Sequence, residues 1–421
     1  EPVSKLAGHR ILALNRGEKE KFLTVKVEAP EEDILRYLEK KIIHKDNPYT
    51  APVLKETVED SYHRLIAPAI EREIRNELTE KAEDGAIEVF GKNLHQLLMQ
   101  PPIAGKVVLG WDPAFRTGCK LAVVDPTGKV IGTTVIYPTA PTTPQKIKAS
   151  KDLLKKIIPK YHISLISLGN GTASRESEQF IVELLKEIPE EKVQYVIVNE
   201  AGASVYSASK LASEEFPNFD VGQRSAASIA RRLQDPLAEL VKIDPKSIGV
   251  GQYQHDMNQK KLGESLSGVV EDCVNKVGVD LNTASAPLLS YISGISSTIA
   301  KNIVAYREEN GRFTDRRELL KVPKLGPKAY EQCAGFMRIQ GGKNPLDMTG
   351  VHPESYDAAE KLLKKQGFTP EDIAGHHLNG LSLTIRDYKK LSEELGIGEI
   401  TLRDIVKDLE KPARDQRDEM P

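Results

Sequence analysis

Over the first hundred residues, apolar side chains recur every three or four positions, which is the spacing of an amphipathic helix. The pattern predicts helices over residues 31–44, 53–78 and 85–98. Pro68 interrupts the second of these, and residues 22–27 have the composition of a short strand. Gln100-Pro101-Pro102 then ends the pattern. We therefore expect the chain to open with a helical region over residues 1–104.

The pattern changes at Gly105, where short apolar runs begin to alternate with longer amphipathic ones. In chain order these runs predict strands at 106–110, 121–124 and 130–137, a helix at 145–158, a strand at 163–168, a helix at 174–188, a strand at 193–198, and helices at 203–215 and 225–241. Asp125-Pro126-Thr127-Gly128 supplies turn residues for a hairpin between the second and third strands. This order predicts a mixed sheet covered by helices, in a domain of residues 105–250.

Beyond Asp280 the sequence predicts short helices joined by tight turns, and part of this pattern repeats after about 30 residues. Residues 292–296 match residues 322–326, apolar with apolar, and each segment lies between two predicted helices. We expect tandem hairpin units over 251–345, followed by a further helical region with a charged C-terminal linker over 346–421. The expected fold class is a multi-domain protein, mainly α with one α/β domain.

Composition excludes several classes of protein. Of the 421 residues, 39% are hydrophobic and 29% are charged, which is too apolar for a disordered chain. No apolar run approaches the roughly 20 residues of a membrane span, so we expect no membrane partner. The three cysteines lie far apart, so neither a zinc site nor a disulfide framework is expected, and no cofactor is expected. This cysteine usage is typical of a reducing compartment, so we expect a cytoplasmic location. The first residues include no initiator Met and no signal peptide, so we expect a longer parent protein.

Charge is unevenly distributed along the chain, although its net value is only −2. Residues 281–343 contain ten Lys and Arg against five Asp and Glu, a balance of +5. Residues 346–421 contain eleven against sixteen, a balance of −5. A basic segment followed by an acidic one points to a polyanionic partner for the first.

Two acids follow predicted strands of the mixed sheet. Asp112 lies within Gly110-Trp111-Asp112-Pro113 at the end of the first strand, and Glu200 comes soon after the strand at 193–198. Carboxylates at strand ends are the groups with which two-metal nucleases hold their ions. The alternative is that Asp112 caps a turn and Glu200 caps a helix. The residues by themselves leave both interpretations open.

Longer motifs carry a family resemblance that covers nearly the whole chain. They are GWDPAFRTG, GNGTASRESE, VNEAGASVYSAS, AASIARRLQDP and DMTGVHPESY, together with the hairpin repeat. The chain resembles the bacterial transcription accessory proteins called Tex, which carry a YqgF-type ribonuclease-H-like domain and tandem helix-hairpin-helix units. The resemblance implies nucleic-acid binding and association with the transcription machinery. It also implies that an OB-fold RNA-binding domain, which follows in the family, and the extreme N-terminus are absent from this chain.

The resemblance also raises the question of nuclease activity. Ribonuclease-H-like resolvases typically present a third acid at the start of the last helix, where this sequence has Gln223 or Arg224. An amide lacks the anionic oxygen that a divalent cation prefers, and an arginine repels the cation. Asp235 lies about three turns further on. We expect Asp112 and Glu200 to be vestigial, with no metal bound and no catalysis; the alternative is a divalent-metal nuclease or Holliday-junction resolvase using these two acids.

The hairpin units supply the candidate nucleic-acid-binding residues. A glycine in the hairpin allows close approach to a phosphate, and the helix that follows presents its first N–H groups to the anion. Each unit keeps one of the two usual glycines. The candidate residues are Gly294, Ile295, Ser296, Lys301, Lys324, Gly326 and Lys328. We expect binding of DNA or RNA without sequence preference, because phosphates carry no base identity; a protein scaffold that docks an acidic partner on the same basic segment is the other interpretation.

Overall fold

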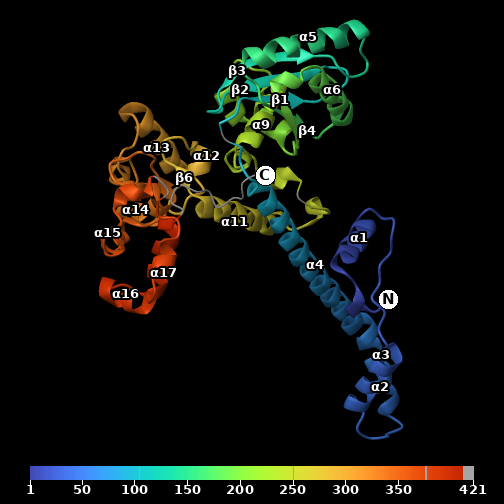
Figure 1. Cartoon of the computed structure of the whole chain (residues 1–421). Coiled ribbons are helices and arrows are strands. Elements are labelled where there is room, and N and C mark those ends of the chain that lie inside the picture. The colour runs from blue at the N-terminus through green and yellow to red at the C-terminus, as the bar shows by residue number, and fades with distance from the viewer. Residues whose placement is uncertain (104, 250, 375–376, 411–421) are drawn as a thin grey trace. The chain divides into compact units, whose positions relative to one another are not determined.

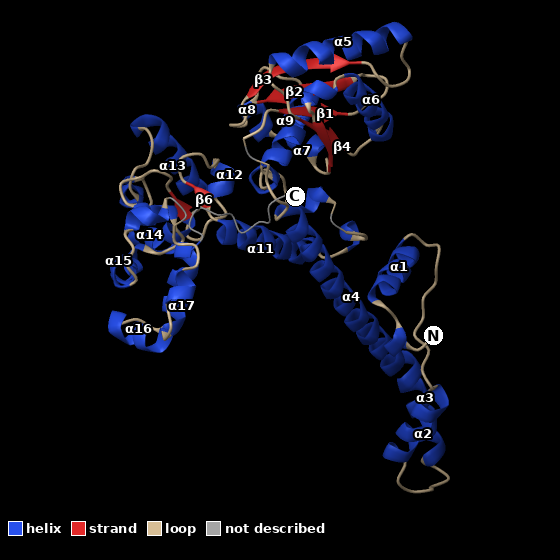
Figure 2. Ribbon diagram, in the orientation of Figure 1, coloured by secondary structure: helices blue, strands red, loops and turns tan. Residues whose placement is uncertain are grey.

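A computed structural model describes residues 1–103, 105–249, 251–374 and 377–410 (Figures 1 and 2). The chain divides into two compact units. The first comprises Glu1–Asn93 and Val250–Leu266, and the second comprises Leu94–Gly249 and Ser267–Pro421. The expected C-terminal linker falls in residues 411–421, outside the described residues.

The N-terminal unit is helical, as the apolar spacing predicts. Its helices are α1 (Gly8–Lys19), α2 (Glu31–Ile42), α3 (Ala51–Ser61), a π-helical turn (Tyr62–Ile66) and α4 (Ala67–Leu98). The expected helices at 53–78 and 85–98 are wrong in their boundaries, because α4 runs unbroken for 32 residues. Pro68 follows directly on the π-helical turn, through which the helical backbone continues from α3 into α4, and the Ala67 N–H donates to the Tyr62 carbonyl oxygen five residues back. Proline has no N–H to donate, and it lies where this wider turn interrupts the ordinary hydrogen-bond pattern of the α-helix.

Residues 22–27 do not form the expected strand. They form a loop that begins with a bend at Phe22, whose side chain is 82% exposed. The Val27 N–H donates to the Glu71 carboxylate of α4 at 3.0 Å rather than to a neighbouring strand. A segment with strand-like composition forms a strand only where another strand pairs with it, and none does so here.

The second unit begins with the expected mixed sheet. Its strands are β1 (Val108–Asp112), β2 (Cys119–Val124), β3 (Val130–Ile136), β4 (Leu165–Gly169) and β5 (Gln194–Val198), in the order β3-β2-β1-β4-β5. β1 pairs antiparallel with β2 and parallel with β4. β2–β3 is antiparallel and β4–β5 is parallel. The first strand ends at Asp112, as expected.

Alternation along β1 directs successive side chains to opposite faces of the sheet. Leu109 and Trp111 pack into a core with α5 (Pro144–Lys160) and α6 (Ser174–Glu187), through residues such as Leu154 and Phe180. The opposite face is covered by α9 (Val221–Gln234) (Figure 1). A Cβ on Gly110 would lie 2.0 Å from the Ala226 carbonyl oxygen, so Gly110 lets α9 lie directly against the sheet.

Shorter helices complete this domain. They are α7 (Ala203–Ser207), α8 (Lys210–Glu215) and α10 (Pro236–Leu240). The sequence predicts that Asp235 lies inside one helix at 225–241. Instead, Asp235 lies between α9 and α10, where its carboxylate accepts the Ala238 N–H at 3.1 Å. It therefore caps α10.

Helices joined by tight turns follow, as the repeat predicts. They are α11 (Gln259–Val277), α12 (Ala286–Leu289), α13 (Ser297–Asn310), a 3₁₀ turn (Arg316–Lys321), α14 (Pro327–Cys333), α15 (Tyr356–Lys365), α16 (Tyr388–Leu395) and α17 (Glu399–Glu410). Two short strands, β6 (Val279–Asp280) and β7 (Met337–Arg338), pair in parallel around the hairpins. Within the described ranges, no helix combines the length and the apolar composition that a membrane span requires.

Candidate functional sites

Asp112 ends β1 on the face that carries α9. The Ser225 hydroxyl, in the first turns of α9, hydrogen-bonds the Asp112 carboxylate. Lys120 is the cross-strand neighbour of Asp112 and attracts its charge. Burial is the larger effect, and it raises the pKa of the Asp112 carboxyl above its ordinary value.

Glu200 follows β5 and turns inward, into the loop after β4. A Cβ on Gly171 would lie 1.6 Å from Glu200 Oε1, and one on Gly169 would lie 2.3 Å from Oε2. The Gly171 N–H hydrogen-bonds the carboxylate, and the Asn170 side chain accepts the Glu200 N–H at 3.1 Å. The Gly169-Asn170-Gly171 loop therefore encloses a carboxylate of the protein itself.

The two acids are close enough to repel one another. Burial raises the pKa of Glu200 most, and the neighbouring Asp112 charge raises it further. Among the described residues, Oε2 of Glu200 is buried without a hydrogen-bond partner. The structure thus places Asp112, at the end of β1, near Glu200, which follows β5.

Arg232 of α9 brings a positive charge to Glu200. Its side chain is buried, and Nη1 donates to the carbonyl oxygens of Asn199 and Ala201, the two neighbours of Glu200, at 2.8 Å each. Glu200 and Glu239 both attract the Arg232 charge, whereas burial lowers the pKa of the guanidinium. A protein cation is thus fixed beside the second acid of the site.

The expected third-acid position is occupied by helix-capping groups. Asp220 and Gln223 form a reciprocal capping box at the start of α9, and Gln223 Nε2 donates to Thr133 at 3.1 Å. Arg224 donates to the Phe216 carbonyl oxygen at 3.1 Å and to Ser213 at 3.2 Å. The residue of α9 that contacts Asp112 is Ser225, which the sequence reasoning missed.

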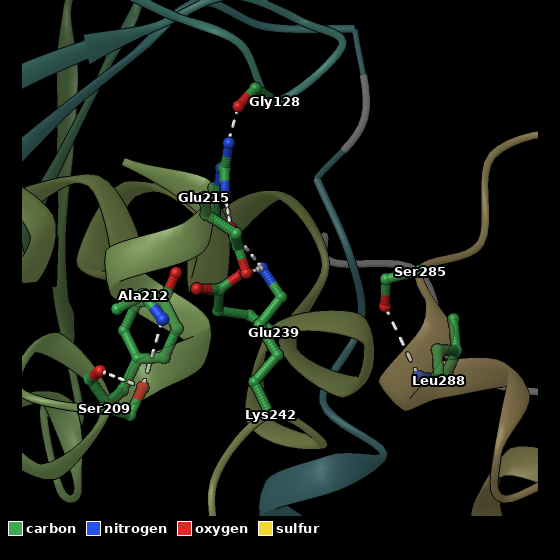
Figure 3. A network of polar contacts seen from close by, with 10 residues as sticks. Gly128, Ser209, Ala212, Glu215, Glu239, Lys242, Ser285 and Leu288 are labelled. Atoms are coloured by element: carbon green, nitrogen blue, oxygen red, sulfur yellow. Dashed lines mark hydrogen bonds and ion pairs between the residues drawn. The ribbon is translucent and has the colours of Figure 1, made fainter. Parts of the chain in front are cut away.

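Charges of alternating sign continue from Arg232 through the helices beneath the sheet. Lys242 Nζ lies 2.9 Å from Glu239 and 3.2 Å from Glu215 (Figure 3). Arg231 lies 2.9 Å from Glu215 and donates to the Gly128 carbonyl oxygen at 2.8 Å. Ion pairs of Glu215, Glu239, Arg231 and Lys242 therefore connect α8, α9 and α10. Arg232, which is attracted to both Glu239 and Glu200, extends this series of opposite charges to Glu200.

A divalent metal pair does not fit this arrangement. Two acids are present, the residue of α9 that contacts Asp112 is Ser225 rather than an acid, and Lys120 and Arg232 each place a cation beside one acid. Across the described ranges, no group of three or more His, Cys, Asp or Glu side chains is placed to hold a metal ion. A metal pair needs several anionic ligands, and these side chains supply too few of them.

In the first hairpin, the turn lies between α12 and α13. Gly294 has φ = +82°, a left-handed conformation that favours glycine. Its Cβ position is already filled from α14, with Gln332 Oε1 2.7 Å away. Ser296 is exposed and caps α13 by accepting the Ile299 N–H at 3.2 Å. Lys301, one turn further along α13, is exposed.

Ile295, which the sequence analysis includes among the candidate binding residues, is buried in the first hairpin turn. Its side chain is 5% exposed, and its N–H already donates to the Ile292 carbonyl oxygen at 3.0 Å. It therefore holds the turn in place and offers a ligand neither an amide nor a side chain.

The second hairpin has the same backbone with different residues. Lys324 occupies the position of Gly294 and has φ = +65°. Gly326 precedes α14, and a Cβ there would meet nothing within 4 Å. Lys324, Gly326 and Lys328 are all exposed. The Asn302 side chain donates to the Pro323 carbonyl oxygen at 2.9 Å, which joins α13 of the first unit to the turn of the second.

Some cations of the basic segment are structural. Arg307 is partly buried and donates to the Leu281 and Ala284 carbonyl oxygens at 2.9 and 3.0 Å. Arg316 is 1% exposed and donates to the Met337 and Val351 carbonyl oxygens, at 2.7 Å each. The cations available to a ligand are therefore fewer than the sequence count suggests. The exposed ones are Lys301, Arg312, Arg317, Lys321, Lys324, Lys328 and Lys343.

Four family descriptions match successive parts of the chain. Residues 1–90 match "Tex central region-like", and residues 106–234 match "Tex protein YqgF-like domain". Residues 274–338 match "Helix-hairpin-helix motif", and residues 344–417 match "HHH domain".

Curated relatives match along nearly the whole chain. YdcI of Bacillus subtilis is 58% identical over 425 residues, covering 100% of this chain and 58% of that protein. The transcriptional accessory protein Tex of Neisseria gonorrhoeae is 47% identical over 432 residues, covering 99% of this chain and 54% of that protein. The human S1 RNA-binding domain-containing protein 1 is 38% identical over 469 residues, covering 97% and 47%. The chain thus spans about half the length of these relatives.

Proposed function

Because this chain belongs to the Tex family of transcription accessory proteins, we propose that it binds nucleic acid through the phosphate backbone at its paired hairpins and serves as a scaffold in transcription. The observation that carries the proposal is the second hairpin. There Lys324, Gly326 and Lys328 are exposed together beside the start of α14, and nothing of the protein lies over Gly326. An anion can approach the backbone at that point while two ammonium groups neutralise it.

The first hairpin supports the same proposal with other groups. Ser296, Ser297 and Thr298 are exposed at the start of α13, where a helix presents N–H groups to an anion. Lys301 adds charge on the next turn. Because these groups would contact phosphates, we expect DNA and RNA to bind without base preference.

Charge reversal at the second hairpin tests this interface. Lys324→Glu with Lys328→Glu should weaken binding of duplex DNA and single-stranded RNA to a similar degree. It should also flatten the dependence of log affinity on log salt by about one unit per lost phosphate contact. The measurement is a fluorescence titration at two or more salt concentrations.

The matched control is Lys361→Glu with Lys364→Glu, two exposed lysines of α15 in the acidic segment. It changes net charge equally but should leave affinity and salt slope near those of the parent. If a folded hairpin variant binds like this control, the hairpins are packing modules. The basic segment is then better interpreted as a docking face for an acidic protein.

We propose further that the ribonuclease-H-like domain does not cleave nucleic acid. Ser225 in place of a third acid, and Arg232 beside Glu200, support this. The alternative is a divalent-metal nuclease or Holliday-junction resolvase that uses Asp112 and Glu200. Incubation of the chain with labelled duplex, single-strand and junction substrates in Mg²⁺ or Mn²⁺ separates the two: cleavage that Asp112→Asn abolishes would establish the nuclease.

The location, the protein partners and the domain boundaries are also part of this proposal. We infer a cytoplasmic location, contact with the transcription machinery and four structural regions, 1–104, 105–250, 251–345 and 346–421. Support for these boundaries comes from the places where the matched family descriptions begin and end.

A further inference from the structure

The helix that crosses the outside of the mixed sheet, α5, has an unusual composition. Its 17 residues include six lysines and one acid, Asp152, a balance of +5. Residues 281–343 need 63 positions to reach the same balance. The side of α5 opposite these lysines is apolar, and Leu154 and Ile158 anchor it on the sheet.

Two of the lysines are engaged by the neighbouring helix. Lys151 lies 3.4 Å from Glu187 of α6, and Lys155 lies 3.0 Å from the same carboxylate. These pairs hold α5 against α6. The row of the helix that faces α6 is therefore largely neutralised.

The other four lysines are exposed and form no ion pair with any described residue: Lys146, Lys148, Lys156 and Lys160. Two of them are steadied by tyrosines, since Lys146 Nζ lies 5.2 Å from the centre of the Tyr137 ring and Lys160 Nζ lies 5.2 Å from that of Tyr161. From Lys148 to Lys160 the helix rises by about 18 Å, at about 1.5 Å per residue. The ammonium groups of these lysines repel one another along that length. Binding of an extended polyanion would remove this repulsion.

We propose that the exposed lysines of α5 form a second contact surface for the phosphate backbone of nucleic acid, separate from the hairpins. This inference rests on the proposed nucleic-acid-binding function and adds the ribonuclease-H-like domain to the binding surface. The contact is made by ammonium groups to phosphate oxygens, so it is independent of sequence and strongly dependent on salt.

The test compares three variants with the parent chain. Lys148→Glu with Lys156→Glu and Lys160→Glu removes the α5 surface, and Lys324→Glu with Lys328→Glu removes the hairpin surface. Lys361→Glu with Lys364→Glu and Lys389→Glu is the control for α5, with the same change of net charge at exposed positions of α15 and α16. The probes are duplex DNA, polyuridylate and, as an acidic polypeptide, polyglutamate.

We expect the α5 variant to bind duplex DNA at least about tenfold more weakly than its control at low salt. Its salt slope should be flatter by about two to three units, because three contacts are lost at about 0.7 to 0.9 units each. Thermal unfolding should stay within a few degrees of the parent. If charge reversal unfolds the domain, Lys148→Gln with Lys156→Gln and Lys160→Gln takes its place, with a smaller loss of affinity in the same direction.

Other outcomes overturn the inference in distinguishable ways. If only the hairpin variant loses affinity, nucleic acid binds at the hairpins and α5 is a solvated face. If the α5 variant loses polyglutamate but keeps DNA and RNA, the surface docks an acidic protein. If the parent chain binds no nucleic acid at low salt, the proposed function fails and the α5 surface fails with it.

Discussion

At the scale of single residues, the pKa of Asp112 gives a test of its environment. Burial raises this pKa above 3.8, so the ionised carboxylate is less favourable in the folded domain than in the unfolded chain. The protonated carboxyl of Asp112 does not carry this penalty, so the folded domain keeps its full stability below pH 3.8. Part of that stability is lost as pH rises through the pKa of Asp112 in the folded domain. Asp112→Asn should therefore match the parent in acid and exceed it near neutral pH, by on the order of 1 kcal/mol.

Trp111 makes this measurement specific to the domain. It is the only tryptophan in the chain and is completely buried beside Asp112. Urea unfolding followed by its fluorescence at several pH values gives the free energy of unfolding for this domain. A less stable Asp112→Asn at neutral pH would mean that a cation stabilises the carboxylate more than burial penalises it.

Lys324 separates backbone strain from charge. Its φ of +65° costs a residue with a Cβ about 1 kcal/mol, whereas glycine adopts it freely. Lys324→Gly should therefore raise the free energy of unfolding and still weaken nucleic-acid binding, because the ammonium is gone. Lys324→Ala keeps the strain and loses the same charge, so it should weaken binding without stabilising the hairpin. Equal thermal stability of the two variants would contradict this account.

Sequence reasoning located the acids of the site better than their partners. Asp112 was predictable because a buried strand ends there. Ser225 and Arg232 were missed because polar and basic side chains are expected on the solvent side of a helix. The small residues of Ala226-Ala227-Ser228 were the available signal, since small residues on a helix permit close packing against a sheet. Arg316 enters the sequence analysis only through the charge count of residues 281–343. An arginine in a basic segment is expected at the surface, and only tertiary packing shows that it is buried.

At the scale of elements, α9 depends on the buried charge of Arg232. Arg232→Gln removes hydrogen bonds to two carbonyl oxygens and leaves Glu239 without one of its cations. Hydrogen bonds to a charged group contribute about 1.5–3 kcal/mol each, so the domain should unfold at distinctly lower urea concentration. Lys210→Gln, which removes an exposed pair with Glu214 in the same domain, should cost less than about 1 kcal/mol. Similar losses in the two variants would show that Arg232 is not a structural counter-ion.

Elements were predicted well where local pattern and tertiary packing agree. The hairpin of β2 and β3 was predictable because Asp125-Pro126-Thr127-Gly128 supplies its turn; Asp125 accepts the Thr127 and Lys129 N–H groups at 2.9 and 3.0 Å. The errors concern helix boundaries. In the N-terminal unit α4 continues through Gly85, because neighbouring turns of a long helix tolerate one glycine. In the sheet domain the expected helices at 203–215 and 225–241 are each divided in two, into α7 and α8 and into α9 and α10.

At the scale of the whole molecule, Arg316 joins two regions that the sequence and the family descriptions treat separately. It lies in the connection between the hairpins, yet Nη1 reaches the Val351 carbonyl oxygen at 2.7 Å and the Tyr356 hydroxyl at 2.8 Å, and Nη2 reaches the Thr349 carbonyl oxygen. Its N–H also donates to Asp347 at 3.2 Å. The second hairpin and the start of the following helical region are therefore held by one buried guanidinium.

This arrangement predicts that the hairpins do not fold independently of residues 346–356. A chain ending at Asn344 loses these partners, and the buried charge left behind should lower the free energy of unfolding by about 3 kcal/mol or more. Nucleic-acid binding should fall with it, because the hairpin turns are no longer fixed. Arg316→Met in the shortened chain should recover part of the stability, since it removes the unpaired charge and keeps apolar bulk. The measurements are thermal unfolding and DNA titration. They compare the full chain with the shortened chain and with its Arg316→Met variant. A shortened chain that unfolds and binds like the parent would mean that Arg316 does not couple the two regions.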